Sequence, residues 1–68
     1  MKNRIKIERA IKDLTQEELA IKIGVSRQTI NSIEKSRYIP STVLALKISQ
    51  EFDKNVNEIF ELEENDFE

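Results

Sequence analysis

The segment from Thr15 to Lys35 constrains the fold of this chain more than any other part of the sequence. Two short stretches with apolar residues three and four positions apart flank the only glycine, Gly24. Glycine ends a helix readily because it adopts the positive φ that a tight turn requires. Ala20 is small enough to let two helices cross closely. The segment therefore predicts two short helices joined by a tight turn through Gly24 to Ser26.

Capping residues set the boundaries of these two helices. Thr15 followed three residues later by Glu18 is the pattern of a capping box, in which each residue satisfies a backbone N–H of the other. Ser26 is the next N-cap candidate. We therefore predict helices over Gln16–Ile23 and Arg27–Lys35.

The rest of the chain also predicts helices, so the expected fold class is all-α with five helices. A first helix over about Arg4–Lys12 is expected to bury an apolar stripe, and a fourth helix after Pro40-Ser41 is expected to be the central member of the core. Asn55 with Glu58 predicts another capping box and a short fifth helix. The stripe comprises Ile7, Ala10, Ile11 and Leu14; the fourth helix carries Val43, Leu44, Ala45, Leu46, Ile48 and Phe52; and the fifth carries Val56, Ile59 and Phe60.

The C-terminal residues allow two interpretations. Phe60 to Glu63 alternate apolar and acidic side chains, which favours a short β-strand against residues near Lys2, although a frayed acidic tail fits as well. We divide the chain into one domain over residues 1–62 and an acidic tail over residues 63–68.

Composition excludes several classes of function. The chain has 68 residues and neither cysteine nor histidine, which rules out disulfides, thiolate zinc sites and imidazole catalysis. There is no glycine-rich phosphate loop, so we expect no enzyme, metal or cofactor. A long apolar run and a signal-peptide pattern are both missing, which predicts a cytoplasmic protein.

Charge is strongly segregated along the chain. Residues 1–40 carry nine lysines and arginines against five acidic residues, whereas residues 41–68 carry two against eight. One basic and one acidic end are compatible with binding a polyanion in a single orientation.

The run QEELAIKIGVSRQTINSIEK combines the small Ala20, the glycine turn and the apolar anchors of a helix-turn-helix. Together with LTQEELA, the Pro-Ser start of the fourth helix and NEIF, it resembles the Cro and lambda-repressor (XRE) family, and within it the small stand-alone dimeric repressors. The resemblance covers about Ile7 to Phe60. Ser36 and Asp53 depart from the family pattern, where glycine or asparagine is usual, and we expect both to adopt left-handed backbone conformations.

The resemblance implies a lambda-repressor-like DNA-binding domain whose third helix reads bases in the major groove. The expected base-contacting residues are Arg27, Gln28, Thr29, Asn31 and Ser32. Residues expected to contact phosphates are Gln16, Ser26, Lys35, Arg37, Tyr38 and Arg9, with Arg4 and Lys6 as weaker candidates. In the family, the pair that Arg9 and Glu34 match forms a salt bridge, so Arg9 is expected mainly to orient the third helix.

The expected function is a transcriptional regulator, a repressor that binds a palindromic DNA operator as a homodimer, with no small-molecule ligand. The apolar residues Val56, Ile59, Phe60 and Leu62 are expected at the dimer interface, because a core this small covers only part of them. Three alternatives stay open: an antitoxin whose acidic end neutralises a basic toxin, a restriction-modification controller, and a pure protein-interaction module.

Overall fold

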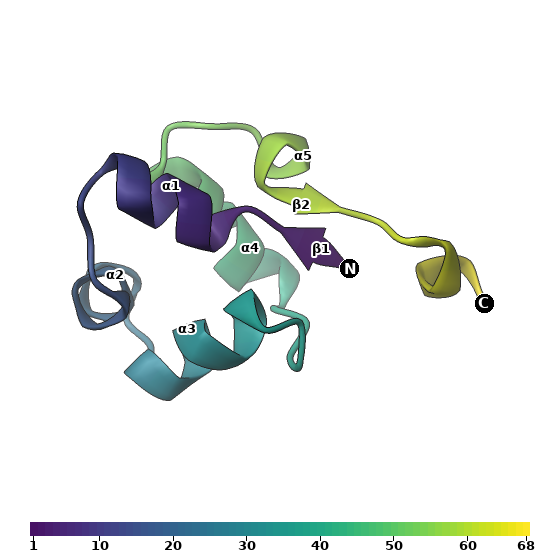
Figure 1. The fold of residues 1–68 in the computed structure, drawn as a ribbon, viewed down its shortest axis with the longest axis horizontal. Helices are drawn as coiled ribbons and strands as arrows, with labels where there is room; N and C mark the ends of the chain where they lie inside the picture. Colours follow the sequence, from purple (N-terminus) through teal and green to yellow (C-terminus); the bar gives the residue numbers. More distant parts are fainter.

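The computed structural model describes all residues 1–68 and contains five α-helices and a two-stranded antiparallel ribbon (Figure 1). The elements in chain order are β1 (Lys2–Asn3), α1 (Ile5–Ile11), α2 (Gln16–Ile23), α3 (Arg27–Glu34), α4 (Thr42–Glu51), α5 (Val56–Ile59), β2 (Phe60–Glu61) and the 3₁₀-helix η1 (Glu64–Phe67). The predicted all-α fold with a short C-terminal strand is confirmed. None of the helices combines the length and the apolar character needed to cross a membrane.

The β-ribbon joins the two ends of the chain. Lys2 pairs with Glu61 and Asn3 with Phe60, and the backbone N–H of Arg4 extends the pairing to the carbonyl of Ile59 at 2.8 Å. The strand interpretation of the C-terminal residues is therefore confirmed, including its pairing near Lys2.

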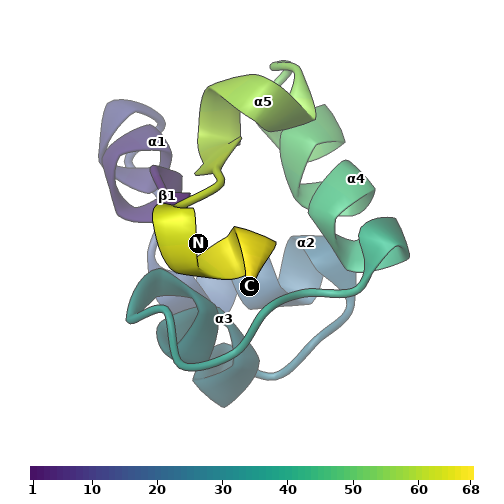
Figure 2. The ribbon, with the colours of Figure 1, turned by 90° about the vertical axis from the view of Figure 1, so that its right-hand side faces the viewer.

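The tail beyond the ribbon does not fray but turns into η1. The backbone N–H of Glu63 donates to the Asp66 carboxylate at 2.7 Å, and the amino group of Met1 lies 2.9 Å from Glu63 and 3.2 Å from Asp66. The N–H of Glu63, followed by the Met1 ammonium, holds the pKa of Asp66 below its usual value. In Figure 1 this segment projects beyond β2, away from the helices, and in Figure 2 it is the part of the chain turned toward the viewer.

One apolar core lies between the helices and contains residues from every α-helix. Ile48 on α4 is fully buried, as expected for a central helix. The core residues are Ile5, Leu19, Ala20, Ile23, Ile30, Ile33, Leu44, Ile48, Phe52, Ile59 and Phe60.

The predicted buried stripe of α1 is wrong. Ile7 and Ile11 are 47% and 68% exposed, Ala10 is exposed, and Leu14 is only partly buried. The buried residues are Ile5 and Glu8. The side of α1 that faces the rest of the domain carries one core residue and charged side chains that bind residues near the end of α4. Ile5 enters the core, Glu8 lies 3.5 Å from the ammonium of Lys54, and the ammonium of Lys12 donates to the carbonyl of Glu51 at 3.0 Å.

Two expectations for α4 and α5 are also wrong. Val43 and Leu46 are 65% and 53% exposed, because Leu44, Ile48 and Phe52 fill the one face of the helix that meets the core. Asn55 is the N-cap of α5, but its side chain makes no capping bond. Its amide donates instead to the carboxylate of Glu58 at 3.3 Å, so the second capping box is missing.

The left-handed positions follow the prediction and add one residue. Ser36 and Asp53 have φ values of 58° and 53°, as expected, and Asp13 has 55°. Aspartate tolerates this region better than most residues, which fits two of the three positions.

Candidate nucleic-acid interface

The turn between α2 and α3 has the predicted chemistry. Gly24 has a φ of 78°, and the backbone N–H groups of Gly24 and Val25 both donate to the carbonyl of Ala20, at 2.8 and 3.0 Å. The Ser26 hydroxyl then caps α3 by accepting the N–H of Thr29 at 3.1 Å. These bonds satisfy the Ala20 carbonyl at the end of α2 and the Thr29 N–H at the start of α3, so the turn between the helices is held by local hydrogen bonds.

Ala20→Leu should destabilise the domain by about 1–3 kcal/mol, because Ala20 on α2 is only 1% exposed and extra methylenes overpack a dense core. Urea unfolding monitored by circular dichroism measures the change. Ile21→Leu, at an exposed position of the same helix, is the matched control and should be neutral. An Ala20→Leu protein as stable as the control would mean that the two helices do not meet closely at this residue.

The capping box of α2 is confirmed in both directions. The Thr15 hydroxyl accepts the N–H of Glu18 at 3.0 Å, and the Glu18 carboxylate accepts the N–H of Thr15 at 2.9 Å. The second bond, followed by the contact with the Thr15 side chain, lowers the pKa of Glu18 below its usual value.

This lowered pKa predicts an acid-sensitive contribution to stability. An unfolded glutamate titrates near pH 4.3, so the Glu18 contribution is fully present above about that pH and is lost as the pH falls through the lower folded value. Urea midpoints of the wild type should therefore drop more steeply than those of Glu18→Gln as the pH is lowered from about 6 to about 3. If the urea midpoints of the two proteins fall equally with pH, the Glu18 carboxylate does not contribute to the loss of stability in acid.

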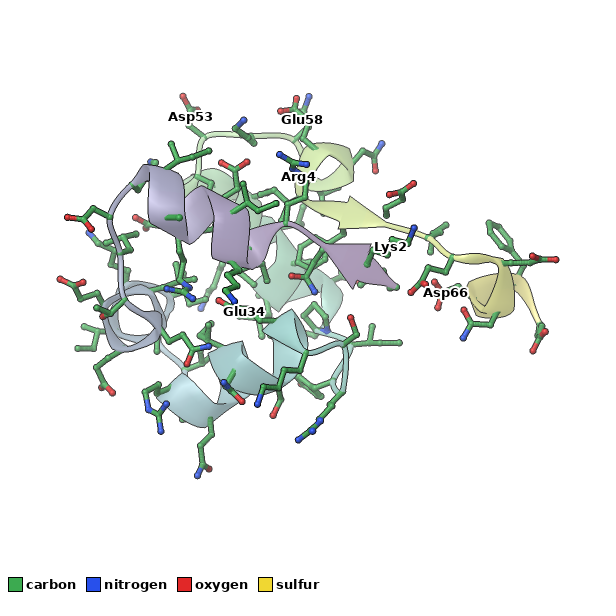
Figure 3. The ribbon with its side chains drawn as sticks, in the orientation of Figure 1. Lys2, Arg4, Glu34, Asp53, Glu58 and Asp66 are labelled. Atoms are coloured by element: carbon green, nitrogen blue, oxygen red, sulfur yellow. The ribbon has the colours of Figure 1, made fainter.

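A hydrogen-bonded network ties α3 to α1 and α2. The guanidinium of Arg9 donates to Glu34 from Nε at 2.6 Å and from Nη2 at 3.1 Å, and its Nη1 donates to the carbonyl of Leu14 at 2.8 Å. The side chains of Arg9 and Glu34 are only 15% and 6% exposed. In Figure 3, Glu34 lies between α1 and α3. The hydrogen bond to Glu34 raises the pKa of Arg9, which keeps its guanidinium charged.

Three further side chains help to hold α3, and these roles were not predicted. The Gln16 amide donates to Glu34 at 3.1 Å and accepts from the amide of Asn31 at 3.4 Å. Asn3 donates from its side chain to the carbonyl of Ile33 at 2.8 Å and so fixes the end of α3 to β1. No local sequence pattern indicates these contacts, because they depend on how α2, α3 and β1 meet in the folded chain.

The outer side of α3 is polar. Arg27 and Gln28 are exposed, whereas Thr29, Asn31 and Ser32 are partly buried. A shallow hollow of about 320 Å³ runs along this side, lined by Ser26, Gln28, Thr29, Ser32 and Tyr38. Three of the five predicted base-contacting residues, Arg27, Gln28 and Ser32, therefore keep free side chains on this helix. The Thr29 hydroxyl is hydrogen-bonded to the Ser26 hydroxyl at 2.9 Å, and the amide of Asn31 is engaged with Gln16.

The residues predicted to contact phosphates fall into two groups. Lys35, Arg37 and Tyr38 are exposed directly after α3, and Ser26 is exposed at its start. Gln16 and Arg9 are partly buried and engaged with Glu34. Arg4 and Lys6, the weaker candidates, lie at the start of α1, and in Figure 3 Arg4 is at the opposite edge of the molecule from α3. The contacts with phosphate stay predictions for every one of them.

Comparison with known proteins gives a consistent family assignment. A helix-turn-helix family model matches residues 5–59. The chain is 52% identical over 66 residues to an uncharacterised HTH-type transcriptional regulator of Methanocaldococcus jannaschii, covering 97% of this chain and 100% of the relative. It is 47% identical over 64 residues to another, YgzD of Bacillus subtilis, covering 94% and 97%.

Among solved structures, the chain is similar to the restriction-modification controller protein C.AhdI from Aeromonas hydrophila. The TM-score is 0.77 at 32% identity, and the match covers 84% of this chain and 86% of the other. The family model, the relatives and the similar solved structure all indicate a helix-turn-helix protein. This agrees with a third helix that is supported by the Arg9–Glu34 network and has an exposed polar side. The chain therefore belongs to the XRE-type helix-turn-helix family of DNA-binding transcriptional regulators, which are not enzymes.

Proposed function

We propose that this protein is a repressor that binds a palindromic operator as a homodimer, with α3 of each copy in the major groove. The observation that carries the proposal is that α3 has an exposed polar side and is held on its other side by hydrogen bonds to the rest of the domain. Arg27 and Gln28 are exposed, while Glu34 at the other end of the helix is fixed by Arg9 and Gln16. A helix held in this way can present its side chains to base edges without a large ordering cost.

The side chains of α3 have the chemistry of base recognition. Arginine binds guanine O6 and N7 in a bidentate manner, and glutamine does the same with adenine N6 and N7. The methyl group of Thr29 suits contact with thymine. Lys35 and Arg37 after α3, with the N–H groups at its start, suit the flanking phosphates and would position the helix without reading sequence.

An apolar surface to which no residue of α3 contributes supports the homodimer. A hollow of about 260 Å³ is lined by Met1, Ile39, Pro40, Thr42, Ala45, Leu46, Val56 and Phe60. Val56 and Phe60 are two of the four predicted interface residues, and Leu62, a third, is exposed beyond β2. Ile59, the fourth, is only 1% exposed in the core of its own chain, so the prediction that it contacts a partner is wrong and it is left out of the proposed interface.

Two copies joined through this surface would explain operator recognition. One recognition helix covers about half of an operator, and symmetric dimers place two such helices about 34 Å apart on one face of the duplex. Occupying two successive major grooves excludes other proteins from that stretch of DNA, which is why we propose repression. Selection of bound DNA from a random pool tests the proposal: a palindrome supports it, whereas an asymmetric single site or no enriched sequence contradicts it.

Arg27→Ala and Gln28→Ala should each weaken binding to the selected operator by about 1–3 kcal/mol, because each removes one bidentate base contact. Binding to random DNA should change little. Titration of both DNAs at the same salt concentration measures the difference. Equal losses on operator and random DNA would remove these residues from base recognition.

Lys35→Ala and Arg37→Ala are the matched controls in this experiment. Because phosphate contacts carry no sequence information, we expect these variants to weaken all DNA alike and to reduce the salt dependence by about one counterion per contact.

A second candidate function rests on the similarity to C.AhdI. That protein is a restriction-modification controller, and the matched region includes most of both chains. A role of this kind uses the same operator binding and differs only in the genes that are regulated. The candidate is supported if the selected palindrome occurs upstream of genes for a DNA methyltransferase and an endonuclease.

A further inference from the structure

Asn31 is the predicted base-contacting residue whose amide is tied into the network around Glu34. It follows Arg27 by four residues and Gln28 by three, so it is a neighbour of both on the surface of α3. Its amide nitrogen donates to the Oε1 of Gln16 at 3.4 Å, and the Nε2 of Gln16 donates to Glu34 at 3.1 Å. Two successive side-chain hydrogen bonds therefore connect the polar side of α3 to a buried ion pair.

The direction of these hydrogen bonds is set by the carboxylate at the inner end. Glu34 already accepts two bonds from the guanidinium of Arg9, and a carboxylate paired with a guanidinium offers only acceptors. Gln16 must therefore turn its NH₂ group toward Glu34 and its oxygen toward Asn31. Asn31 must in turn direct NH₂ to that oxygen, because a reversed amide would set two oxygens against each other.

This arrangement leaves the oxygen of Asn31 free. No group of the chain donates to Oδ1, and no buried side-chain oxygen in the structure lacks a hydrogen-bond partner. Oδ1 of this partly buried residue therefore reaches solvent. The folded chain thus determines which end of the Asn31 amide is available to a ligand, and that end is an acceptor.

We propose that Asn31 determines specificity at one base of each half-site by accepting a hydrogen bond from an exocyclic amino group, either N6 of adenine or N4 of cytosine. This inference rests on the proposed function, in which α3 lies in the major groove. There adenine and cytosine present amino donors, whereas guanine and thymine present keto oxygens. A fixed acceptor binds the first two bases on the contacted strand and repels the other two.

The hydrogen bonds behind Asn31 are what make it selective. An unrestrained asparagine amide can rotate and offer NH₂ to a keto oxygen or its own oxygen to an amino group. Gln16 and Glu34 prevent this rotation without touching the base, so both are positioning residues. A phosphate contact by Gln16, in contrast, would strengthen binding to all sequences alike.

Selection of bound DNA from a random pool, carried out in parallel with the wild type and Asn31→Ala, identifies the base that Asn31 contacts. At that base the wild type should prefer adenine or cytosine to guanine or thymine by about tenfold, and Asn31→Ala should show no preference. Gln28→Ala is the matched control and should lose preference at a different base. A wild type that prefers guanine or thymine there, or an Asn31→Ala protein with an unchanged profile, overturns the proposal.

Two substitutions of Gln16 test the fixed orientation of the amide. Gln16→Met frees the Asn31 amide to rotate, so the preference for amino bases should be lost while the other bases of the site are read as before. Gln16→Lys supplies an ammonium, which has donors only and can donate to both Glu34 and the Asn31 oxygen. It should turn the NH₂ of Asn31 outward and reverse the preference to guanine or thymine. Circular dichroism and binding to random DNA verify that each variant is folded.

The outcomes separate this inference from the proposed function. A palindrome whose base preferences are unchanged in both Gln16 variants overturns the fixed amide and leaves the operator proposal in place. An affinity loss in Gln16→Met that is equal for all sequences assigns Gln16 to phosphate contact and also overturns it. An asymmetric selected site contradicts the symmetric operator, yet an amino preference in that site that depends on Asn31 and Gln16 supports the inference.

Discussion

Arg9→Met is expected to destabilise the domain by about 3 kcal/mol or more, a large part of the stability of a chain this short. The substitution removes every partner that Arg9 supplies to the almost fully buried Glu34 carboxylate and leaves only the Gln16 amide. An ionised carboxylate without its counter-charge is costly to keep out of water. Urea unfolding, compared at constant pH and salt, measures the loss.

The double variant Arg9→Met/Glu34→Met separates stability from the orientation of α3. Because two apolar side chains of similar size need no desolvation of charge, most of the lost stability should return. Gln16 and Asn31 would still lack their acidic anchor. We therefore expect a folded double variant with reduced operator affinity. If the double variant binds operator like the wild type, the network has no role in holding the recognition helix.

The helix-turn-helix was predictable from sequence because its determinants are local. Thr15 and Glu18 satisfy each other within one helical turn, and Gly24 adopts the left-handed conformation that its lack of a side chain permits. The bounds of α2 agree with the prediction at both ends, and those of α3 differ by one residue. The strand pairing was also foreseen, since alternation of period two is visible in four residues.

The orientation of α1 was not predictable from its periodicity. Apolar spacing identifies a strip of residues but does not show whether the strip faces the core. In α1 the side that faces the rest of the domain carries Glu8 and Arg9, which form ion pairs with Lys54 and Glu34. The prediction that Val43 and Leu46 of α4 are buried was wrong for a related reason, because a small domain covers only one face of each helix. Residues that act through distant partners, such as Asn3, give no local pattern at all.

The candidate site also contains residues that were predictable from sequence and residues that were not. Arg27 and Gln28 were foreseen as exposed residues of α3, and the structure keeps them exposed. The hydrogen bond between the Gln16 and Asn31 amides was not predicted, because the sequence indicates that both side chains contact DNA. Polar side chains near a recognition helix can support the helix or contact the ligand, and only the contacts within the folded chain distinguish the two roles.

Leu46→Asp is expected to abolish dimerisation and to lower operator affinity by about 100- to 10,000-fold, the range in which a second linked contact normally contributes. Leu46 is 53% exposed at the apolar hollow, so the change should leave the core intact while placing a charge where the partner would pack. Sedimentation equilibrium at micromolar concentration and titration of the operator measure the two effects.

The control for Leu46→Asp is Ile21→Asp, which makes the same change of charge at an exposed isoleucine of α2 outside the hollow. It should stay dimeric and lose little affinity, since a single distant charge acts on DNA only through screened electrostatics. Half-site DNA gives a second comparison: Leu46→Asp and wild type should bind it equally, because one copy is sufficient there. If the wild type is monomeric, or if Leu46→Asp still dimerises and binds the full operator normally, the two copies must meet through another surface.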